Sequence, residues 1–88
     1  MPAPPILHVG CRNFVVAQHV LALVSADSAP MRRLIQNLRK NGQVIDATQG
    51  RKTKSVLFLQ NSSVVLSAVS QESLAKRLGA IEVDDKDE

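Results

Sequence analysis

The pattern of apolar and polar residues predicts a chain built mainly from strands. ILHVG at 6–10 has the apolar character of a first strand. Residues 14–25, FVVAQHVLALVS, are rich in valine and leucine and contain no glycine or proline, which predicts one long strand or two strands joined by a bulge. Three later apolar runs, at 43–48, 55–60 and 64–69, predict three more strands.

Two helices are predicted, one in the middle of the chain and one after the last strand. The first covers 29–40, where Pro30 suits a first helical turn and Asn41-Gly42 suits a C-terminal stop. A short second helix is predicted between a Ser70 cap and Gly79. In the first helix, the candidate N-caps are Ser25, Asp27 and Ser28, the apolar stripe is Met31, Leu34, Ile35 and Leu38, and the opposite face carries Arg32, Arg33, Gln36, Arg39 and Lys40.

The connections between the later strands are short, which predicts how these strands pair. Residues 49–54 join the strands at 43–48 and 55–60, and residues 61–63 lead on to the strand at 64–69. We therefore expect the three strands to be antiparallel neighbours. The expected fold is α+β, a small antiparallel sheet with two helices in the order β-β-α-β-β-β-α.

Several predicted strands are apolar on both faces, although a half-exposed antiparallel strand alternates apolar and polar residues. The runs are Val20–Val24, Val56–Leu59 and Val64–Leu66. Two short helices cannot cover both sides of such a sheet, and the apolar surface left open would exceed the few hundred Å2 usual for a monomer. We expect another copy of the chain to cover it, which makes the protein a homo-oligomer. The alternative is a sheet coiled strongly enough to wrap its own helices.

Length and composition fit one folded domain. The chain has 88 residues, of which 44% are hydrophobic, and this is too apolar for a disordered segment. It has no apolar run of about 18 residues, so no membrane span is expected. The opening MPAPPIL lacks the features of a signal peptide, and the single Cys11 fits a reducing compartment. A cytoplasmic location is therefore predicted.

Charge is divided unequally along the chain. The formal net charge is +3, but residues 82–88 hold five acids and one lysine, a net of −4. The predicted domain, residues 1–81, holds ten lysines and arginines against three acids, a net of +7. So basic a domain attracts polyanions and acidic proteins. We expect the acidic tail to be disordered, and either to compete with phosphate for the basic surface or only to increase solubility.

The titratable residues do not form a recognisable catalytic or metal-binding constellation. His8 and Cys11 lack an evident third partner, and two histidines with one cysteine at unrelated spacings do not match a zinc site. Neither a P-loop nor a dinucleotide-binding glycine motif occurs. Asp46, between apolar neighbours, would be costly to bury alone, so a salt bridge to an arginine is expected. We predict no enzyme activity, no cofactor, no metal and no small-molecule substrate.

The strongest local signal is GRKTK at 50–54, where three cations occupy four positions of a strand connection. Arg51 can make a bidentate contact with phosphate oxygens, Lys52 and Lys54 act as point charges, and Thr53 can donate a hydrogen bond. The alternative interpretation is an ordinary solvated turn. The basic charge of the whole domain favours phosphate binding.

The sequence also indicates which nucleic acid is bound. Single strands are usually held by aromatic platforms, and this chain has only Phe14 and Phe58, both in apolar strands. A helix-turn-helix is excluded because three strands separate the predicted helices. Duplex recognition led by phosphate contacts is therefore expected.

Motifs along the chain carry a family resemblance: LHVGCRN at 7–13, SAPMRRLIQ at 28–36, IDATQGRKTK at 45–54 and VVLSAV at 64–69. In their order and spacing, residues 6–79 resemble the RemA family, bacterial regulators of extracellular-matrix genes such as those of biofilms. The resemblance implies a DNA-binding transcriptional regulator with a LytTR-like fold. It also implies a ring of dimers with DNA following its basic rim, and it matches the family's helix cations to Arg32 and Arg33.

Three positions depart from the family pattern. His19 stands where an arginine implicated in DNA contact is expected, so this contact is expected to be weaker or pH-dependent. Cys11-Arg12 replaces an aromatic-glycine pair and adds a cation. Gln49 replaces a common tyrosine.

The predicted partners are double-stranded DNA and further copies of the chain, in the nucleoid. Arg51 and Lys52 are predicted as the principal DNA anchors and Lys54 and Thr53 as secondary contacts, with Arg12, His19, Arg32 and Arg33 as flanking contacts. Two alternatives are an oligomeric scaffold whose basic rim recruits an acidic protein, and an RNA-binding protein.

Overall fold

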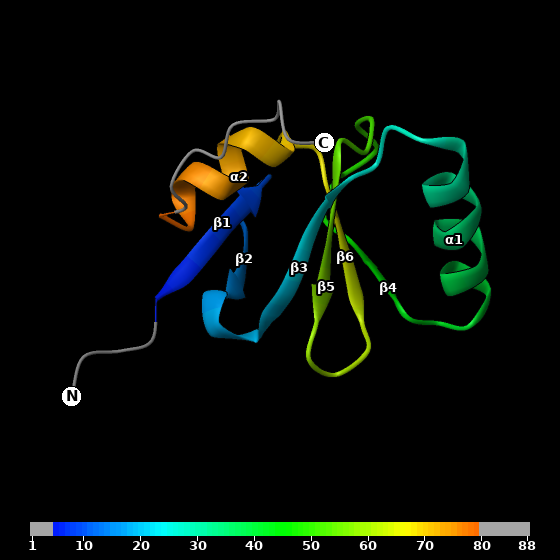
Figure 1. Ribbon diagram of the computed structural model, residues 1–88, viewed down its shortest axis with the longest axis horizontal. Coiled ribbons are helices and arrows are strands. Elements are labelled where there is room, and N and C mark those ends of the chain that lie inside the picture. Colours follow the sequence, from blue (N-terminus) through cyan, green and yellow to red (C-terminus); the bar gives the residue numbers. More distant parts are fainter. Residues whose placement is uncertain (1–4, 80–88) are drawn as a thin grey trace, which may run out of the picture.

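The computed structural model describes residues 5–79 of the chain, so the predicted acidic tail lies outside the described residues. Its elements are β1 (Ile6–Gly10), β2 (Asn13–Val16), a 3-10 turn η1 (Ala17–His19), β3 (Val20–Ser25), α1 (Ala29–Lys40), β4 (Val44–Asp46), β5 (Ser55–Leu59), β6 (Val64–Ser67) and α2 (Gln71–Arg77) (Figure 1). The predicted α+β class with two helices is confirmed. No helix of this part of the chain has the length and apolar character needed to cross a membrane.

The strands form two sheets rather than one. β1 and β2 pair with each other, and the other four strands form a sheet in the order β3-β5-β6-β4. The segment 14–25 therefore contains two strands of different sheets, separated by η1. The expectation of a single long strand, or of two strands joined only by a bulge, was wrong because the chain turns at η1 and leaves the plane of the first sheet.

The pairing of β4 also differs from the prediction. β4 lies beside β6 and parallel to it, with Val44 opposite Val64, so it is not a neighbour of β5 and the sheet is not purely antiparallel. Crossing one intervening strand requires only about 10 Å, or two strand spacings, and the eight residues from 47 to 54 span that distance easily. A short connection therefore did not require adjacent strands.

The helix ends follow local sequence signals. Ser28 caps α1, because its Oγ accepts a hydrogen bond from the backbone N–H of Met31 at 3.1 Å. Ser70 caps α2 in the same way, accepting from the N–H of Ser73 at 3.2 Å. Of the three candidate caps Ser25, Asp27 and Ser28, only Ser28 caps α1, whereas the predicted Ser70 cap of α2 is confirmed. The bounds 29–40 predicted for the first helix are those of α1.

The four-stranded sheet has a core on each face, which explains its doubly apolar strands. On one face, Val56, Val64 and Leu66 pack with Ile35 of α1. On the other face, Leu57 and Val65 pack with residues of the β1–β2 hairpin and α2, among them Leu7, Val9 and Leu74. Figure 1 shows this hairpin and α2 on one side of the molecule and α1 on the other. The chain covers much of both faces itself, so the doubly apolar strands do not by themselves require a second copy, and the homo-oligomer stays a prediction.

Buried hydroxyl groups join the hairpin and the end of β6. Ser67 Oγ donates a hydrogen bond to the carbonyl oxygen of Val9 at 2.7 Å, and Ser55 Oγ donates to that of Val69 at 2.7 Å. A Cβ atom on Gly10, whose φ is +97°, would lie 2.9 Å from Cγ2 of Val69, so glycine permits this close approach. These contacts fix the end of β1 against the sheet.

Asp46, at the end of β4, links α1 to the chain that follows the strand. Its Oδ2 lies 3.2 Å from Nη2 of Arg39, and its Oδ1 accepts hydrogen bonds from the hydroxyl of Thr48 at 2.6 Å and from the Thr48 N–H at 2.9 Å. The predicted salt bridge to an arginine is confirmed, within one chain. The pKa of Asp46 lies below its ordinary value. The largest cause is the hydrogen bond from the Thr48 hydroxyl, followed by the one from the Thr48 N–H, and Arg39 contributes less; partial burial acts in the opposite direction.

Replacing Asp46 with asparagine is expected to destabilise the fold in a pH-dependent way. The loss at pH 7 should be about 0.5–1 kcal/mol, because the side chain is 39% exposed and solvent screens the ion pair. The folded-state pKa lies below the ordinary value of 3.8, so the stabilisation is present above that value and is lost as the pH falls through the folded pKa. Urea unfolding of both proteins at pH 7 and at lower pH tests this.

Asp27→Asn is the matched control, since Asp27 is exposed and its carboxylate accepts no hydrogen bond from the described residues. Its unfolding free energy should stay close to that of the parent. If the parent and Asp46→Asn differ in unfolding free energy by the same amount at low pH as at pH 7, the Asp46 carboxylate does not have the stabilising role described.

Candidate nucleic-acid interface

The three cations predicted to bind phosphate lie on the connection between β4 and β5. We call residues 51–54 the basic loop. A tight turn precedes it: Gln49 and Gly50 have φ values of 51° and 83°, and the Arg51 N–H donates to the Thr48 carbonyl oxygen at 3.1 Å. The backbone N–H of Lys54 donates to the carbonyl oxygen of Ser67 at 2.8 Å, which ties the far end of the loop to the sheet. The Arg51 and Lys52 side chains are exposed on this anchored backbone.

The turn between β1 and β2 is fastened to the start of the same connection. Asn13 Nδ2 donates to the carbonyl oxygen of Ala47 at 3.4 Å, and Gln49 Nε2 donates to that of Cys11 at 3.2 Å. The thiol of Cys11 lies 3.7 Å from the carbonyl oxygen of Thr48. Two turns that are more than thirty residues apart in sequence therefore form one edge of the molecule.

This arrangement brings Arg12 close to the basic loop. Arg12 has a φ of 64° and an exposed side chain at the tip of the β1–β2 turn. We define the basic edge as Arg12 together with Arg51, Lys52 and Lys54. Sequence reasoning missed the role of Asn13 and Gln49 in holding the two turns together, because their partners are backbone carbonyl groups more than thirty residues away.

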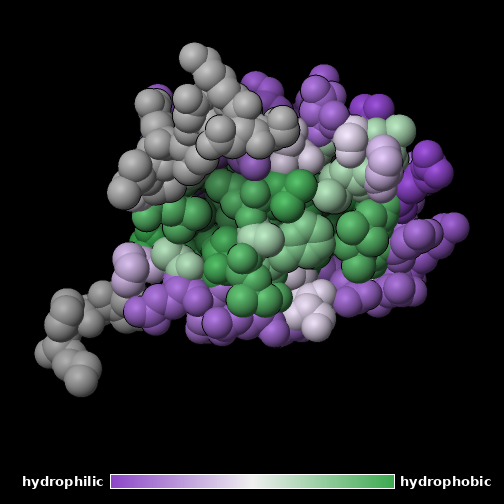
Figure 2. Space-filling view, viewed as in Figure 1, coloured by the Kyte–Doolittle hydropathy of each residue, from purple (hydrophilic) through white to green (hydrophobic). Residues whose placement is uncertain are grey.

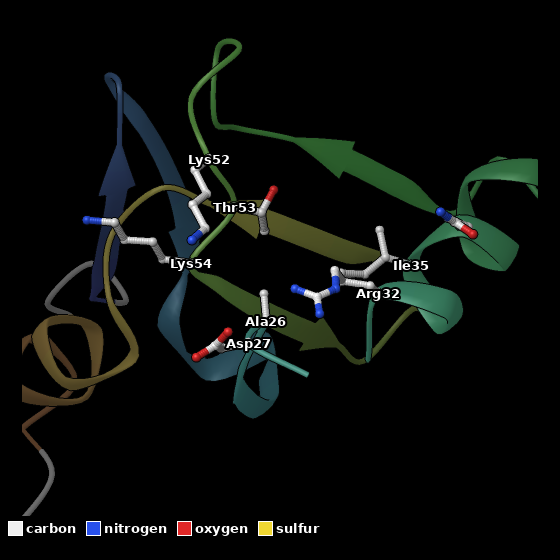
Figure 3. Close-up of a pocket in the computed structure, with 8 residues that line it drawn as sticks. Ala26, Asp27, Arg32, Ile35, Lys52, Thr53 and Lys54 are labelled. Carbon is white, nitrogen blue, oxygen red and sulfur yellow. The ribbon is translucent and has the colours of Figure 1, made fainter. Parts of the chain in front are cut away.

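Arg32 approaches the basic loop from the other side. A hollow of about 430 Å3 separates the loop from α1, and Arg32, Lys52, Thr53 and Lys54 are among the residues that line it (Figure 3). Arg33 is the next residue of the helix and is exposed, but it does not line the hollow. Arg32 thus joins the predicted DNA-binding residues of the loop, whereas Arg33 remains a separate surface cation.

His19 lies at the opposite end of the sheet from the basic loop. Its carbonyl oxygen accepts a hydrogen bond from the N–H of Gln60, beside the β5–β6 turn. Val20 pairs with Leu59, whereas Ser25 pairs with Ser55 next to Lys54. Five residues of strand cover about 16 Å. Within one chain, His19 therefore does not join the basic edge.

Most cations of the described chain have no acidic partner. Residues 5–79 hold ten lysines and arginines against three acids, a net of +7, and Arg39–Asp46 is their one ion pair within 4 Å. Lys40 follows Arg39 at the end of α1, and Lys76 and Arg77 lie on α2. Five of the ten cations gather around the loop: Arg12, Arg32, Arg51, Lys52 and Lys54. Residues 5–79 include no group of three or more histidines, cysteines or acids able to hold a metal ion.

An apolar groove opens elsewhere on the surface. It has a volume of about 250 Å3 and lies between the β1–β2 hairpin and the sheet, where Phe14 and Ile45 are 55% and 53% exposed. Leu21, at the bulge of β3, is 67% exposed. Figure 2 shows apolar side chains gathered across the middle of one face, with polar side chains around them. The sequence predicted surplus apolar surface, but it did not show which residues would form it.

Comparison with known proteins gives a consistent family assignment. Residues 6–78 match the family described as extracellular matrix regulatory protein A-like. The chain is 46% identical over 72 residues to a protein of Nitratidesulfovibrio vulgaris (strain DSM 19637 / Miyazaki F), covering 82% of each. It is 40% identical over 84 residues to one of Maridesulfovibrio salexigens, covering 96% of this chain and 98% of that protein. Both relatives carry the name "Putative regulatory protein".

A further relative with this name, from Synechococcus elongatus, is 45% identical over 76 residues, which is 86% of this chain and 87% of the relative. The family match extends through the β1–β2 turn, α1 and the basic loop, and so includes all the elements that carry the candidate interface. The chain therefore belongs to the RemA-like family of regulatory proteins.

Proposed function

We propose that this regulatory protein binds double-stranded DNA along its basic edge and does so as a homo-oligomer. The observation that carries the proposal is the joining of the β1–β2 turn to the basic loop, which collects exposed cations without an acidic partner among the described residues. Cations on an anchored backbone suit a polyanion, because less backbone freedom is lost when phosphate binds.

The chemistry of the basic edge favours phosphate oxygens over base edges. Arg51 can donate two parallel hydrogen bonds to one phosphate, and Lys52 adds a mobile point charge. Arg12, on the neighbouring turn, can reach a different phosphate of the same duplex. Contacts of this kind fix the position of a protein on DNA without reading its sequence. Selection of a target site would then depend on DNA shape and deformability.

Stacking on single-stranded bases has less support. Phe14 is exposed, but its nearest aromatic neighbour is the imidazole of His8, with ring centroids 5.0 Å apart, and Phe58 is partly buried in the core. Binding of successive unpaired bases needs several aromatic faces along one path. A duplex, whose charge is accessible along its whole length, fits the cationic edge better.

Assembly would multiply a weak contact. One basic edge is small and can neutralise only a few phosphates, so its affinity alone is modest at physiological salt. Copies arranged with their basic edges on one side would bind the same duplex together and gain affinity through avidity. The groove beside Phe14 and Ile45 is the apolar surface best placed to join copies, because it does not include the basic edge.

Replacing Arg51 and Lys52 together with alanine is expected to weaken binding to duplexes of any sequence by at least about tenfold. The slope of log affinity against log salt should also become shallower, by about 0.9 for each phosphate that the variant no longer engages. Fluorescence anisotropy with a labelled duplex at several salt concentrations measures both quantities. Light scattering should show an unchanged particle mass.

The control for this variant is Lys40→Ala with Lys76→Ala. It removes the same net charge from exposed positions outside the basic edge. Affinity close to that of the parent is expected. If the two double variants lose affinity equally, binding depends on net charge alone and the assigned interface is incorrect.

Replacing Phe14 and Ile45 together with glutamine is expected to reduce the mass of the native particle. Both side chains are more than half exposed, so the fold of the single chain should persist. Assembly at the groove would remove water from the new amide groups without giving them a hydrogen-bond partner, and this cost should oppose association. Native mass spectrometry gives the particle mass, and circular dichroism tests the fold.

Leu34→Gln with Leu78→Gln serves as a control for lost apolar surface outside the groove; these leucines are 39% and 37% exposed, so circular dichroism must also show that this variant keeps its fold. Its particle mass should equal that of the parent. An unchanged mass in the Phe14 and Ile45 variant would show that copies do not meet at this groove.

A further inference from the structure

The hollow between α1 and the basic loop has the size of a ligand site. Its volume of about 430 Å3 falls within the range of roughly 300–1,000 Å3 that is usual for small-molecule sites. One wall comes from residues 32–36 of α1 and the other from the basic loop, with residues 26 and 27 between them (Figure 3). A lone inorganic ion would leave most of this volume empty.

Cations face each other across the hollow. In Figure 3 the guanidinium of Arg32 and the amine of Lys52 point into the space above Ala26 from opposite walls, whereas the amine of Lys54 points away. Asp27 is the one acid in the lining, so three cations against one acid leave a net charge of +2. No carboxylate of the described residues lies within 4 Å of these cations.

The remaining lining combines neutral hydrogen-bonding groups with an apolar floor. Thr53 contributes a hydroxyl and Gln36 an amide, and both can hydrogen-bond to oxygen atoms. Ala26 and Ile35 are buried members of the core on the α1 face. The hollow therefore pairs two opposed positive charges with a small apolar surface.

We propose that this hollow binds a phosphate ester. Arg32 and Lys52 would hold the phosphoryl oxygens from the two walls, and the organic group would lie against Ala26 and Ile35. A phosphoryl group suits opposed cations better than a planar carboxylate does, because its oxygens point in several directions at once. We assign the bound ester to an effector or to part of a partner, and no reaction is included in the proposal.

The ester has two possible sources, a backbone phosphodiester of bound DNA and a free mononucleotide. In the first case the site rests on the proposed function, because Lys52 belongs to the basic edge. In the second case the site does not depend on DNA binding, and a nucleotide bound in the hollow would compete with DNA for Lys52. The shared chemistry is the phosphoryl group beside an apolar floor.

The experiment compares four forms of the full chain, namely the parent, Arg32→Gln, Arg33→Gln and Arg51→Gln. Isothermal titration calorimetry measures binding of adenosine monophosphate and of inorganic phosphate, and fluorescence anisotropy measures binding of a labelled duplex. Arg33→Gln is the matched control, since it removes the same charge from the same helix outside the hollow. Circular dichroism and particle mass test whether each variant keeps its fold and assembly.

Adenosine monophosphate is expected to bind the parent more tightly than inorganic phosphate does, because only the ester can contact the apolar floor. Arg32→Gln should weaken its binding about tenfold or more, as expected for removal of a charge-assisted hydrogen bond, with Arg33→Gln and Arg51→Gln within about twofold of the parent. A different result would identify the ester as a DNA phosphodiester: the parent would not bind the nucleotide, and Arg32→Gln, but not Arg33→Gln, would bind the duplex more weakly than the parent.

The two proposals can fail separately. Nucleotide binding that depends on Arg32, in a protein that does not bind duplex, would support the hollow and refute the DNA-binding edge. Identical nucleotide and duplex binding by Arg32→Gln and Arg33→Gln would overturn the phosphate-ester site, even if Arg51→Gln weakens binding to DNA.

Discussion

The candidate interface depends on a small group of hydrogen bonds between two turns. Asn13 and Gln49 join the β1–β2 turn to the chain after β4, and Asp46 fixes Thr48 at the start of that chain. Without these bonds, Arg12 and Arg51 would lie on independent turns, and the entropy of ordering both would oppose phosphate binding. The carboxylate of Asp46 has a second partner in Arg39, so α1 is held at the same junction.

The same packing explains why the chain is apolar throughout yet presents a charged edge. The hairpin and α2 cover one face of the four-stranded sheet and α1 packs against the other, so the doubly apolar strands mainly build two cores. Surplus apolar surface remains at Phe14, Leu21 and Ile45. None of the cations of the basic edge lines the apolar groove, so the proposed association of copies at the groove would not require these cations to be buried.

Features set by neighbouring residues could be predicted from the sequence, whereas features set by distant contacts could not. The bounds of α1 followed from Ser28, Pro30 and the Asn41-Gly42 stop. The order of the strands could not be predicted, because the parallel pairing of β4 with β6 joins residues about twenty positions apart and no local signal marks it. The basic loop was visible as a cluster of charge. Its connection to Arg12, the hollow beside Arg32 and the remote position of His19 all depend on tertiary structure.

If phosphates lie along the basic edge, bound DNA should shield the lysines of that edge from chemical modification, which lysine footprinting measures. The native protein is acetylated with and without a duplex, and mass spectrometry reports the modification of each lysine. Protection of Lys52 and Lys54 is expected, with Lys40 and Lys76, which are exposed on the two helices, as reactive as in the free protein. Protection of Lys40 or Lys76 while Lys52 and Lys54 remain reactive would show that DNA does not lie along the basic edge.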